Sequence, residues 1–169
     1  ELMFNELSGK ITNIEMHEGN FGNNLQVTFT DTDGDVTLSL GTNTSFGEDF
    51  MKKLPAINLD AEVVVKPYNF TDDRGKTMKG ITVLQNETKV ENFFWDKEKQ
   101  QAINGMPNPK GDKAKYTKDK WKIYFTEVKI FLEEYVTEKF VKTVKKADTT
   151  ANAVMEDLDK GIDPEDINI

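Results

Sequence analysis

Residues 66–79 combine cationic side chains with flat aromatic rings. The residues that carry this pattern are, in chain order, Lys66, Tyr68, Phe70, Arg74, Lys76 and Lys79. Such a combination is typical of single-strand nucleic-acid binding, because cations follow the phosphates while rings stack on the bases. Tyr68 and Phe70 are two residues apart, so they share one face of an extended chain. That face is either the interior of the domain or an exposed stacking surface, and the spacing leaves both open.

Further aromatic residues are candidates for the same chemistry. Phe21 lies between two glycines at an expected loop tip, where an aromatic side chain is more typical of a ligand contact than of a core. Phe93, Phe94 and Trp95 are consecutive. Three neighbouring rings cannot all point inward, so at least one is exposed or covered by the next segment. We take Phe94 and Trp95 as candidate contacts.

A second basic run follows in a polar stretch. Its members are Lys110, Lys113, Lys115, Lys118, Lys120 and Lys122, with Tyr116 among them. The run is either a solvated loop or a mobile arm that follows the phosphates. Under the second interpretation Lys113, Lys115 and Tyr116 contact nucleic acid.

The net charge of −8 hides an uneven distribution. Residues 1–65 hold 3 basic and 11 acidic side chains, whereas residues 66–129 hold 14 basic and 9 acidic ones, a net +5. Residues 147–169 hold 1 basic and 7 acidic side chains, a net −6. The chain therefore has a basic middle and an acidic end, and its overall acidity does not exclude a polyphosphate partner.

Catalytic chemistry is not expected. His17 is the only histidine and the chain has no cysteine, so neither a serine nor a cysteine triad has its base and partner in recognisable form. Gly75-Lys76-Thr77 resembles the end of a phosphate-binding loop, but Phe70 stands where that motif needs glycine. The aspartates at 31, 33 and 35 fit a turn better than a calcium loop. We expect no enzyme activity, no cofactor and no metal.

The elements that must position these residues are mainly strands. Alternation of apolar and polar residues and the turn signals between them predict strands at residues 7–16, 24–31, 35–40, 61–65, 77–85 and 88–94. Asp33-Gly34 predicts a tight hairpin turn. A short helix is predicted to begin at Ser45, through the capping-box spacing of Ser45 and Glu48, and to end before Pro55.

Three meandering strands, a short helix and a further hairpin is the element order of an OB-fold, a five-stranded barrel. Another small β-barrel or sandwich is the alternative. We therefore predict a mainly β chain with added α structure, in four parts: an OB-fold domain at 1–95, a basic flap or loop at 96–119, an amphipathic helix at 120–146 and an acidic segment at 147–169.

The predicted long helix has a broad aromatic stripe. Its apolar residues recur every three or four positions from Trp121 to Val144. We expect this stripe to pack on the barrel or on a second copy of the chain, which makes a homodimer a candidate. No apolar run is long enough to span a membrane.

The chain resembles the single-stranded DNA-binding proteins encoded by bacteriophages. The resemblance covers residues 5–95 and rests on four motifs: Leu7-Ser-Gly-Lys-Ile-Thr-Asn-Ile, the stretch from Gly22 to Phe29, Leu54-Pro55-x-Ile57-x-Leu59, and Lys66-Pro-Tyr-x-Phe70 with Gly80-Ile81-x-Val83. It implies an OB-fold that coats single strands during phage replication and recombination, in the cytoplasm of the infected bacterial host.

The resemblance also implies an acidic C-terminus that recruits replication or recombination proteins and competes with DNA. The residues that match such a tail are Asp163, Glu165, Asp166, Ile167 and Ile169. The tails of this family are denser in acid and end in an aromatic residue, so a structural C-terminal turn is the alternative here. A different class of function also stays open, namely an OB-fold module that binds protein, such as a virion or host-takeover adaptor.

Overall fold

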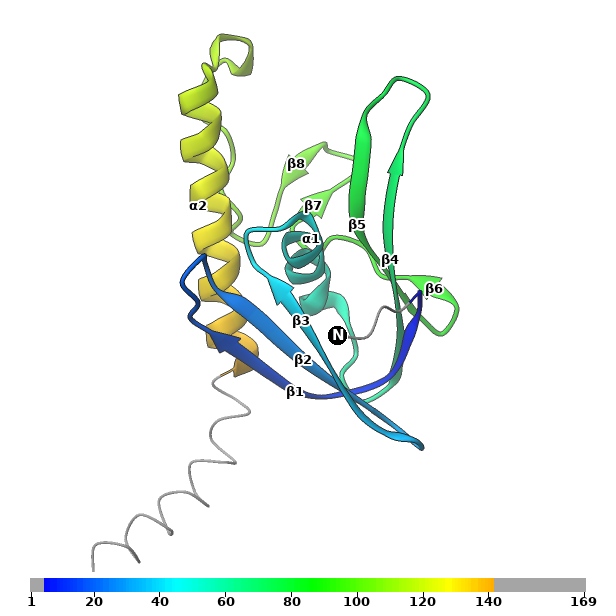
Figure 1. Cartoon of the computed structure of the whole chain (residues 1–169). Coiled ribbons are helices and arrows are strands. Elements are labelled where there is room, and N and C mark those ends of the chain that lie inside the picture. The colour runs from blue at the N-terminus through cyan, green and yellow to red at the C-terminus, as the bar shows by residue number, and fades with distance from the viewer. Residues whose placement is uncertain (1–4, 142–169) are drawn as a thin grey trace, which may run out of the picture.

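A computed structural model describes residues 5–141, and its centre is a six-stranded antiparallel sheet (Figure 1). The strands lie in the order β3-β2-β1-β4-β5-β6. Their bounds are β1 (Leu7–His17), β2 (Asn24–Asp31), β3 (Gly34–Gly41), β4 (Glu62–Thr71), β5 (Thr77–Gln85) and β6 (Thr88–Lys89). The predicted strands at 24–31 and 77–85 are confirmed residue for residue.

Strand β1 joins the two halves of the sheet. Its residues from Lys10 to His17 pair with β2, while residues Leu7 to Lys10 pair with β4. The register shifts between Ile11 and Asn13, and such a bulge bends a strand and increases its twist. One strand can therefore serve two sheet halves that face different directions. Among the described residues β3 and β5 are not paired with each other.

The core lies inside this bent sheet. Along β2 the residues Leu25, Val27 and Phe29 are buried while their neighbours are not, which confirms the period of two in the sequence. Val63 and Val65 of β4 and Ile81 and Val83 of β5 are buried in the same way.

Helix α1 (Ser45–Lys53) follows β3 and packs against both β3 and β5. The predicted cap is wrong by one residue. Thr44 is the N-cap, because its backbone is extended and its hydroxyl accepts a hydrogen bond from the Gly47 N–H at 3.1 Å. A 3₁₀ turn at Leu54–Ala56 contains Pro55 and ends the helical stretch.

The predicted strand at 61–65 is too short and the predicted strand at 88–94 is too long. β4 continues to Thr71 because it keeps its pairing with β5 to that point. β6 ends at Lys89 because the chain then leaves the sheet for α1, where the Phe93 N–H donates to the Lys52 carbonyl. The side chain of Asn92 accepts from the Phe94 N–H and fixes the turn.

The predicted flap or loop at 96–119 is irregular over most of its length and includes a few short elements. It contains part of a small hairpin, β7 (Trp95–Asp96) with β8 (Gln101–Ala102), and a 3₁₀ turn at Lys113–Lys115. Side chains satisfy much of its backbone: Asn108 accepts from the Ala102 N–H, and Asp112 caps the 3₁₀ turn. These bonds give the segment a defined path from the sheet to the second helix.

Helix α2 (Lys118–Val136) begins at the N-cap Thr117 and continues as a π-helical turn at Thr137–Val141. Val128, Leu132 and Val136 are buried against the rest of the domain, so packing on the sheet domain, the first of the two predicted roles, is confirmed. The rest of the predicted helix, from 142 to 146, and the acidic segment at 147–169 lie outside the described residues. None of the described helices is long and apolar enough to cross a membrane.

Candidate nucleic-acid interface

The outer half of the β4–β5 hairpin projects from the sheet as a two-stranded ribbon (Figure 1). β1 pairs with β4 only as far as Val65, so among the described strands the residues beyond it have β5 as their only neighbour. The turn is closed by Asp72, whose carboxylate accepts from the N–H groups of Arg74 and Lys76 at 3.0 and 2.8 Å. Gly75 has a φ of +76°, a conformation that glycine adopts without strain.

Tyr68 and Phe70 lie on the outward face of this ribbon. They occupy the even positions of β4, opposite the buried odd positions Val63 and Val65. Their ring centroids are 6.0 Å apart, and Phe70 is 55% exposed. Of the two faces that the spacing left open, the structure therefore selects the one outside the core.

A glycine makes room for the Tyr68 ring. Gly80 pairs with Tyr68 across the hairpin, and a Cβ at this position would collide with the Tyr68 hydroxyl and the Asp49 carboxylate. Only glycine at position 80 leaves room for the Tyr68 hydroxyl and the Asp49 carboxylate to lie against the strand. Burial, and secondarily the charge of Asp49, raise the pKa of Tyr68, so its phenol is protonated at neutral pH.

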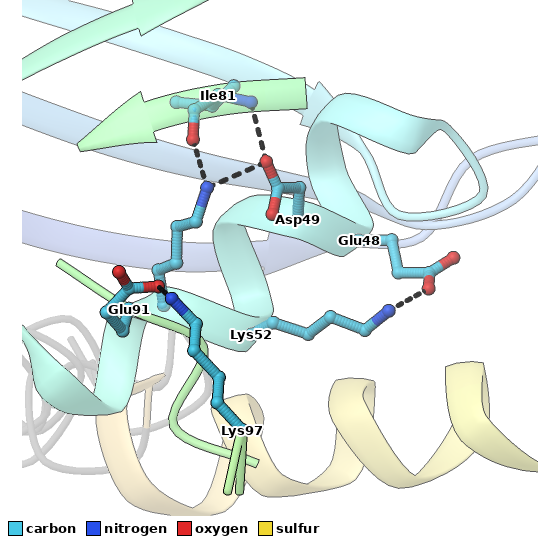
Figure 2. Close-up of polar contacts among 7 residues, drawn as sticks. Glu48, Asp49, Lys52, Ile81, Glu91 and Lys97 are labelled. Carbon is cyan, nitrogen blue, oxygen red and sulfur yellow. Dashed lines mark hydrogen bonds and ion pairs between the residues drawn. The ribbon is translucent and has the colours of Figure 1, made fainter. Parts of the chain in front are cut away.

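Two side chains of α1 hold the base of the ribbon (Figure 2). The Asp49 carboxylate accepts from the Ile81 N–H at 2.7 Å and from the Lys53 ammonium at 2.9 Å, while Lys53 also donates to the Ile81 carbonyl. Both backbone polar groups of Ile81 thus find partners on the helix, where a further strand would otherwise have to supply them.

The outward face forms one wall of a cleft of about 360 Å³, which we call the hairpin cleft. Its lining consists of Lys53, Tyr68, Phe70, Met78, Thr82, Val83, Lys89, Val90, Glu91 and Lys97. Of its three lysines, Lys53 is already bound to Asp49, and Lys89 has no ion-pair partner within residues 5–141. Lys97 lies 2.8 Å from Glu91, and this hydrogen bond and charge lower the pKa of that carboxyl (Figure 2). The cleft combines the exposed ring of Phe70 and the half-buried ring of Tyr68 with lysines on its rim.

A second hollow, the tip cleft, lies between the end of the hairpin and the start of α1. It has a volume of about 460 Å³ and is lined by Ser45 and by residues 76–79, so Lys76 and Lys79 are the charged groups in it. Met78 borders both clefts. Among residues 5–141 no ion pair engages Lys76, Lys79 or Arg74, which is exposed at the turn.

Lys66 differs from the other predicted cations of this hairpin. It shares the face of Tyr68, because it pairs with Thr82, but its ammonium lies 2.9 Å from the Glu6 carboxylate. Both partners are about half exposed, so the pair is a weak one. A phosphate can compete for Lys66 at low cost.

The choice of Phe94 as a contact is wrong in this structure. Its side chain is 0% exposed and packs edge-to-face against Phe131 and Tyr135 of α2, with centroids 5.4 and 5.0 Å away. Of the three consecutive rings, Trp95 is the exposed one, at 37%, and it does not line the hairpin cleft. Phe94 instead joins α2 to the sheet domain.

The remaining predicted contacts lie outside the hairpin and tip clefts. Phe21 is 93% exposed, and its carbonyl accepts from the Asn43 side chain. Lys113 and Lys115 are exposed on the 3₁₀ turn, where Lys115 lies 3.7 Å from Asp112. Tyr116 packs against Trp121 at 4.8 Å, with the Lys120 ammonium 4.2 Å above its ring. The tail residues Asp163, Glu165, Asp166, Ile167 and Ile169 lie outside the described residues.

The lysines that complete the hairpin cleft were not predicted from the sequence. Lys53, Lys89 and Lys97 come from a helix, a strand end and a loop, and no spacing links them. Met78 also lines the cleft and is the missed residue that the sequence could have placed, because it pairs with Phe70 in the register of the hairpin. In the described part of the chain no group of three potential metal ligands was found.

Comparisons of the chain with protein-family models, with curated proteins and with solved structures each gave no match.

Proposed function

We propose that this protein binds single-stranded DNA with little sequence specificity, through the hairpin cleft and the tip cleft. The observation that carries the proposal is the outward face of the β4–β5 ribbon. There Tyr68, Phe70 and Met78 form an accessible surface beside lysines from three other segments. Ring faces accept any base, and lysines accept the phosphates without reading sequence.

We further propose that the bent sheet is an OB-type barrel. Three features support this: β1 pairs with both β2 and β4, the helix lies between β3 and β4, and the strand order is β3-β2-β1-β4-β5 before β6. Where a barrel would be closed by pairing of β3 with β5, α1 packs against both strands. In an OB-type barrel the loop between β4 and β5 flanks the binding face.

The phage setting follows from the sequence resemblance. The chain would then protect single strands during phage replication and recombination in the host cytoplasm. The acidic end, through residues such as Asp163 and Ile169, would recruit replication proteins or modulate binding. A homodimer belongs to the same set of predictions.

The proposal is tested by titrating fluorescently labelled oligo-dT with the protein at two salt concentrations and following anisotropy. We expect saturable binding that weakens as salt rises. Phe70→Ala should weaken binding about 10-fold, since one stacked base contributes about 1–3 kcal/mol. Val36→Ala is the matched control, because Val36 is a similarly exposed apolar residue, at 47%, on the other hairpin.

Two outcomes would contradict the proposal. One is the absence of binding at low salt, both by the full chain and by a variant that ends at residue 146. The other is an equal loss of affinity in Phe70→Ala and Val36→Ala. The first outcome would favour the protein-binding module instead.

A further inference from the structure

A second cleft that contains both rings and cations lies on α2. It has a volume of about 470 Å³ and is formed between α2, the end of β3 and the start of α1. We call it the α2 cleft, and its lining consists of Thr42, Asn43, Glu48, Lys118, Trp121, Lys122, Phe125, Thr126 and Lys129. Its residue types repeat those of the hairpin cleft on a different element.

The rings of the α2 cleft form a stacked platform. Trp121 and Phe125 are one helical turn apart, their centroids are 5.7 Å apart and their planes differ by 21°. Phe125 is 58% exposed, and Tyr116 also packs against Trp121, with ring centroids 4.8 Å apart. A nearly parallel ring pair with one exposed member presents a flat surface on which a base can stack.

The charges of the α2 cleft are mainly positive. Three lysines line it against one carboxylate, Glu48, which is already paired with Lys52. Lys118 and Lys122 have no ion-pair partner within residues 5–141, and Lys129 lies 3.8 Å from Glu133. This surface is complementary to a polyanion, whereas a purely apolar partner would leave the lysines without a counter-charge.

The helix that carries the platform is held firmly against the sheet domain. The Glu133 carboxylate accepts from the hydroxyl of Thr42, which is 1% exposed, and from the Asn23 amide at 3.2 Å. Phe94 packs against two rings of α2 from the other side. The α2 cleft is therefore built into the fold and does not depend on a freely moving helix.

The tip cleft adjoins the hairpin cleft and lies near the α2 cleft along the chain. Met78 borders both the hairpin cleft and the tip cleft, and Ser45 of the tip cleft is two residues from Asn43 of the α2 cleft. Figure 1 shows α1 between α2 and the β4–β5 hairpin. Together the three clefts are lined by eight lysines and two carboxylates.

We propose that the α2 cleft is a second subsite for the same single strand, in which a base stacks on Phe125 and the phosphates meet Lys118 and Lys122. The strand would run from the hairpin cleft past the tip cleft to α2. This inference rests on the proposed function and adds a path to it: short oligonucleotides fill the hairpin cleft alone, and longer ones reach both.

The test compares oligo-dT of about 6 and about 20 nucleotides, because single-strand sites span about 4–16 nucleotides per OB-fold. We expect Phe125→Ala to weaken binding of the long oligonucleotide about 10-fold and that of the short one less than about 2-fold. Phe70→Ala should weaken both. Ile123→Ala is the matched control, because Ile123 is 61% exposed on α2 and does not line the cleft.

A charge variant gives an independent measurement on the same surface. Lys122→Gln should weaken binding of the long oligonucleotide about 8-fold at about 50 mM salt, because the loss of one phosphate contact changes the salt slope by about 0.7. It should leave the short oligonucleotide unchanged. Because Lys122 is exposed, this variant is expected to fold as the wild type does.

Each result separates the two proposals. If the wild type binds neither oligonucleotide, the proposed function itself fails. If Phe70→Ala weakens binding but Phe125→Ala and Lys122→Gln leave the long oligonucleotide unaffected, the hairpin site stands and the second subsite is overturned. If Phe125→Ala changes only the sedimentation-derived mass, the α2 cleft is a contact between copies of the chain, which also overturns the subsite.

Discussion

The β2–β3 and β4–β5 hairpins carry similar residues on their inward faces and different residues on their outward faces. Both bury β-branched and aliphatic residues, such as Val27 and Leu38 in one and Val65 and Val83 in the other. The β2–β3 hairpin, residues 24–41, contains three aspartates and no lysine or arginine. Residues 66–79 of the β4–β5 hairpin contain four cations, two carboxylates and the rings of Tyr68 and Phe70. The inward faces account for the fold, and the outward faces account for the proposed function.

The hairpins also differ in how they are supported. β2 pairs with β1 and with β3 over almost its whole length, and threonines hydrogen-bond across its outer face. Within residues 5–141 the outer half of β4 has only β5 beside it, and the base of that ribbon depends on Asp49 and Lys53 of α1. A ribbon that leaves the sheet has accessible faces, and an anchored base keeps those faces in place.

The largest effect is expected from removing the charge difference between the hairpin tips. Replacing Arg74, Lys76 and Lys79 together by Gln should lower oligo-dT affinity about 500-fold at about 50 mM salt and about 30-fold at about 200 mM, if each contacts one phosphate. The slope of log affinity against log salt should become about 2 less steep. Anisotropy titrations over a salt series measure both quantities.

The control for that variant is a charge removed from the other tip. Asp33→Asn is suitable, because within residues 5–141 Asp33 is held only through its backbone N–H, which donates to the Asp31 carboxylate at 2.7 Å. We expect the salt slope to stay unchanged. A slope that changes as much as in the triple Gln variant would mean that the two tips act alike, and the comparison would fail.

The support of the ribbon can be broken at Asp49. Asp49→Ala leaves the N–H of Ile81, a residue that is 1% exposed, without its acceptor, which should lower the free energy of unfolding by about 1–3 kcal/mol. Urea unfolding measures this loss, and hydrogen exchange should localise the change to β4 and β5. Thr28→Ala, which removes an exposed hydrogen bond of the other hairpin, should cost less than about 1 kcal/mol. Equal losses would show that α1 does not anchor the ribbon.

The smallest effect concerns the pH dependence of stability. Because the folded-state pKa of Tyr68 is raised above 10.0, its contribution is fully present below pH 10 and is lost as pH rises through the folded-state pKa. Wild-type stability should therefore fall relative to that of Tyr68→Phe above pH 10, in urea unfolding followed at increasing pH. A constant difference would contradict the raised pKa. Tyr124, whose pKa is also raised, should leave a residual fall in the variant.

Local sequence patterns predicted most of the fold. Period-two alternation identified strands such as 24–31, because burial of one face of a strand is enough to produce the alternating pattern. The patterns failed where a longer-range contact decides the conformation. β4 extends past residue 65 because β5 pairs with it, and the chain leaves β6 early because Phe93 and Phe94 pack toward the helices.

The candidate site was predictable only in part for the same reason. Tyr68 and Phe70 were identified from composition and spacing, but their face depends on where the pairing of β1 with β4 ends. Lys53, Lys89 and Lys97 meet them from separate segments, so no local pattern could place them in one cleft. Phe94 and Trp95 are both aromatic, and only the position of α2 determines which ring is buried.

The central claim is that single-stranded DNA contacts the β4–β5 hairpin and not the β2–β3 hairpin. Backbone amide chemical shifts of the labelled protein, followed during titration with oligo-dT, test it most directly. We predict large changes within residues 66–79 and at Lys53, Lys89 and Lys97, with residues 28–37 unchanged. Changes concentrated on residues 28–37, with 66–79 unaffected, would contradict this assignment of the binding surface.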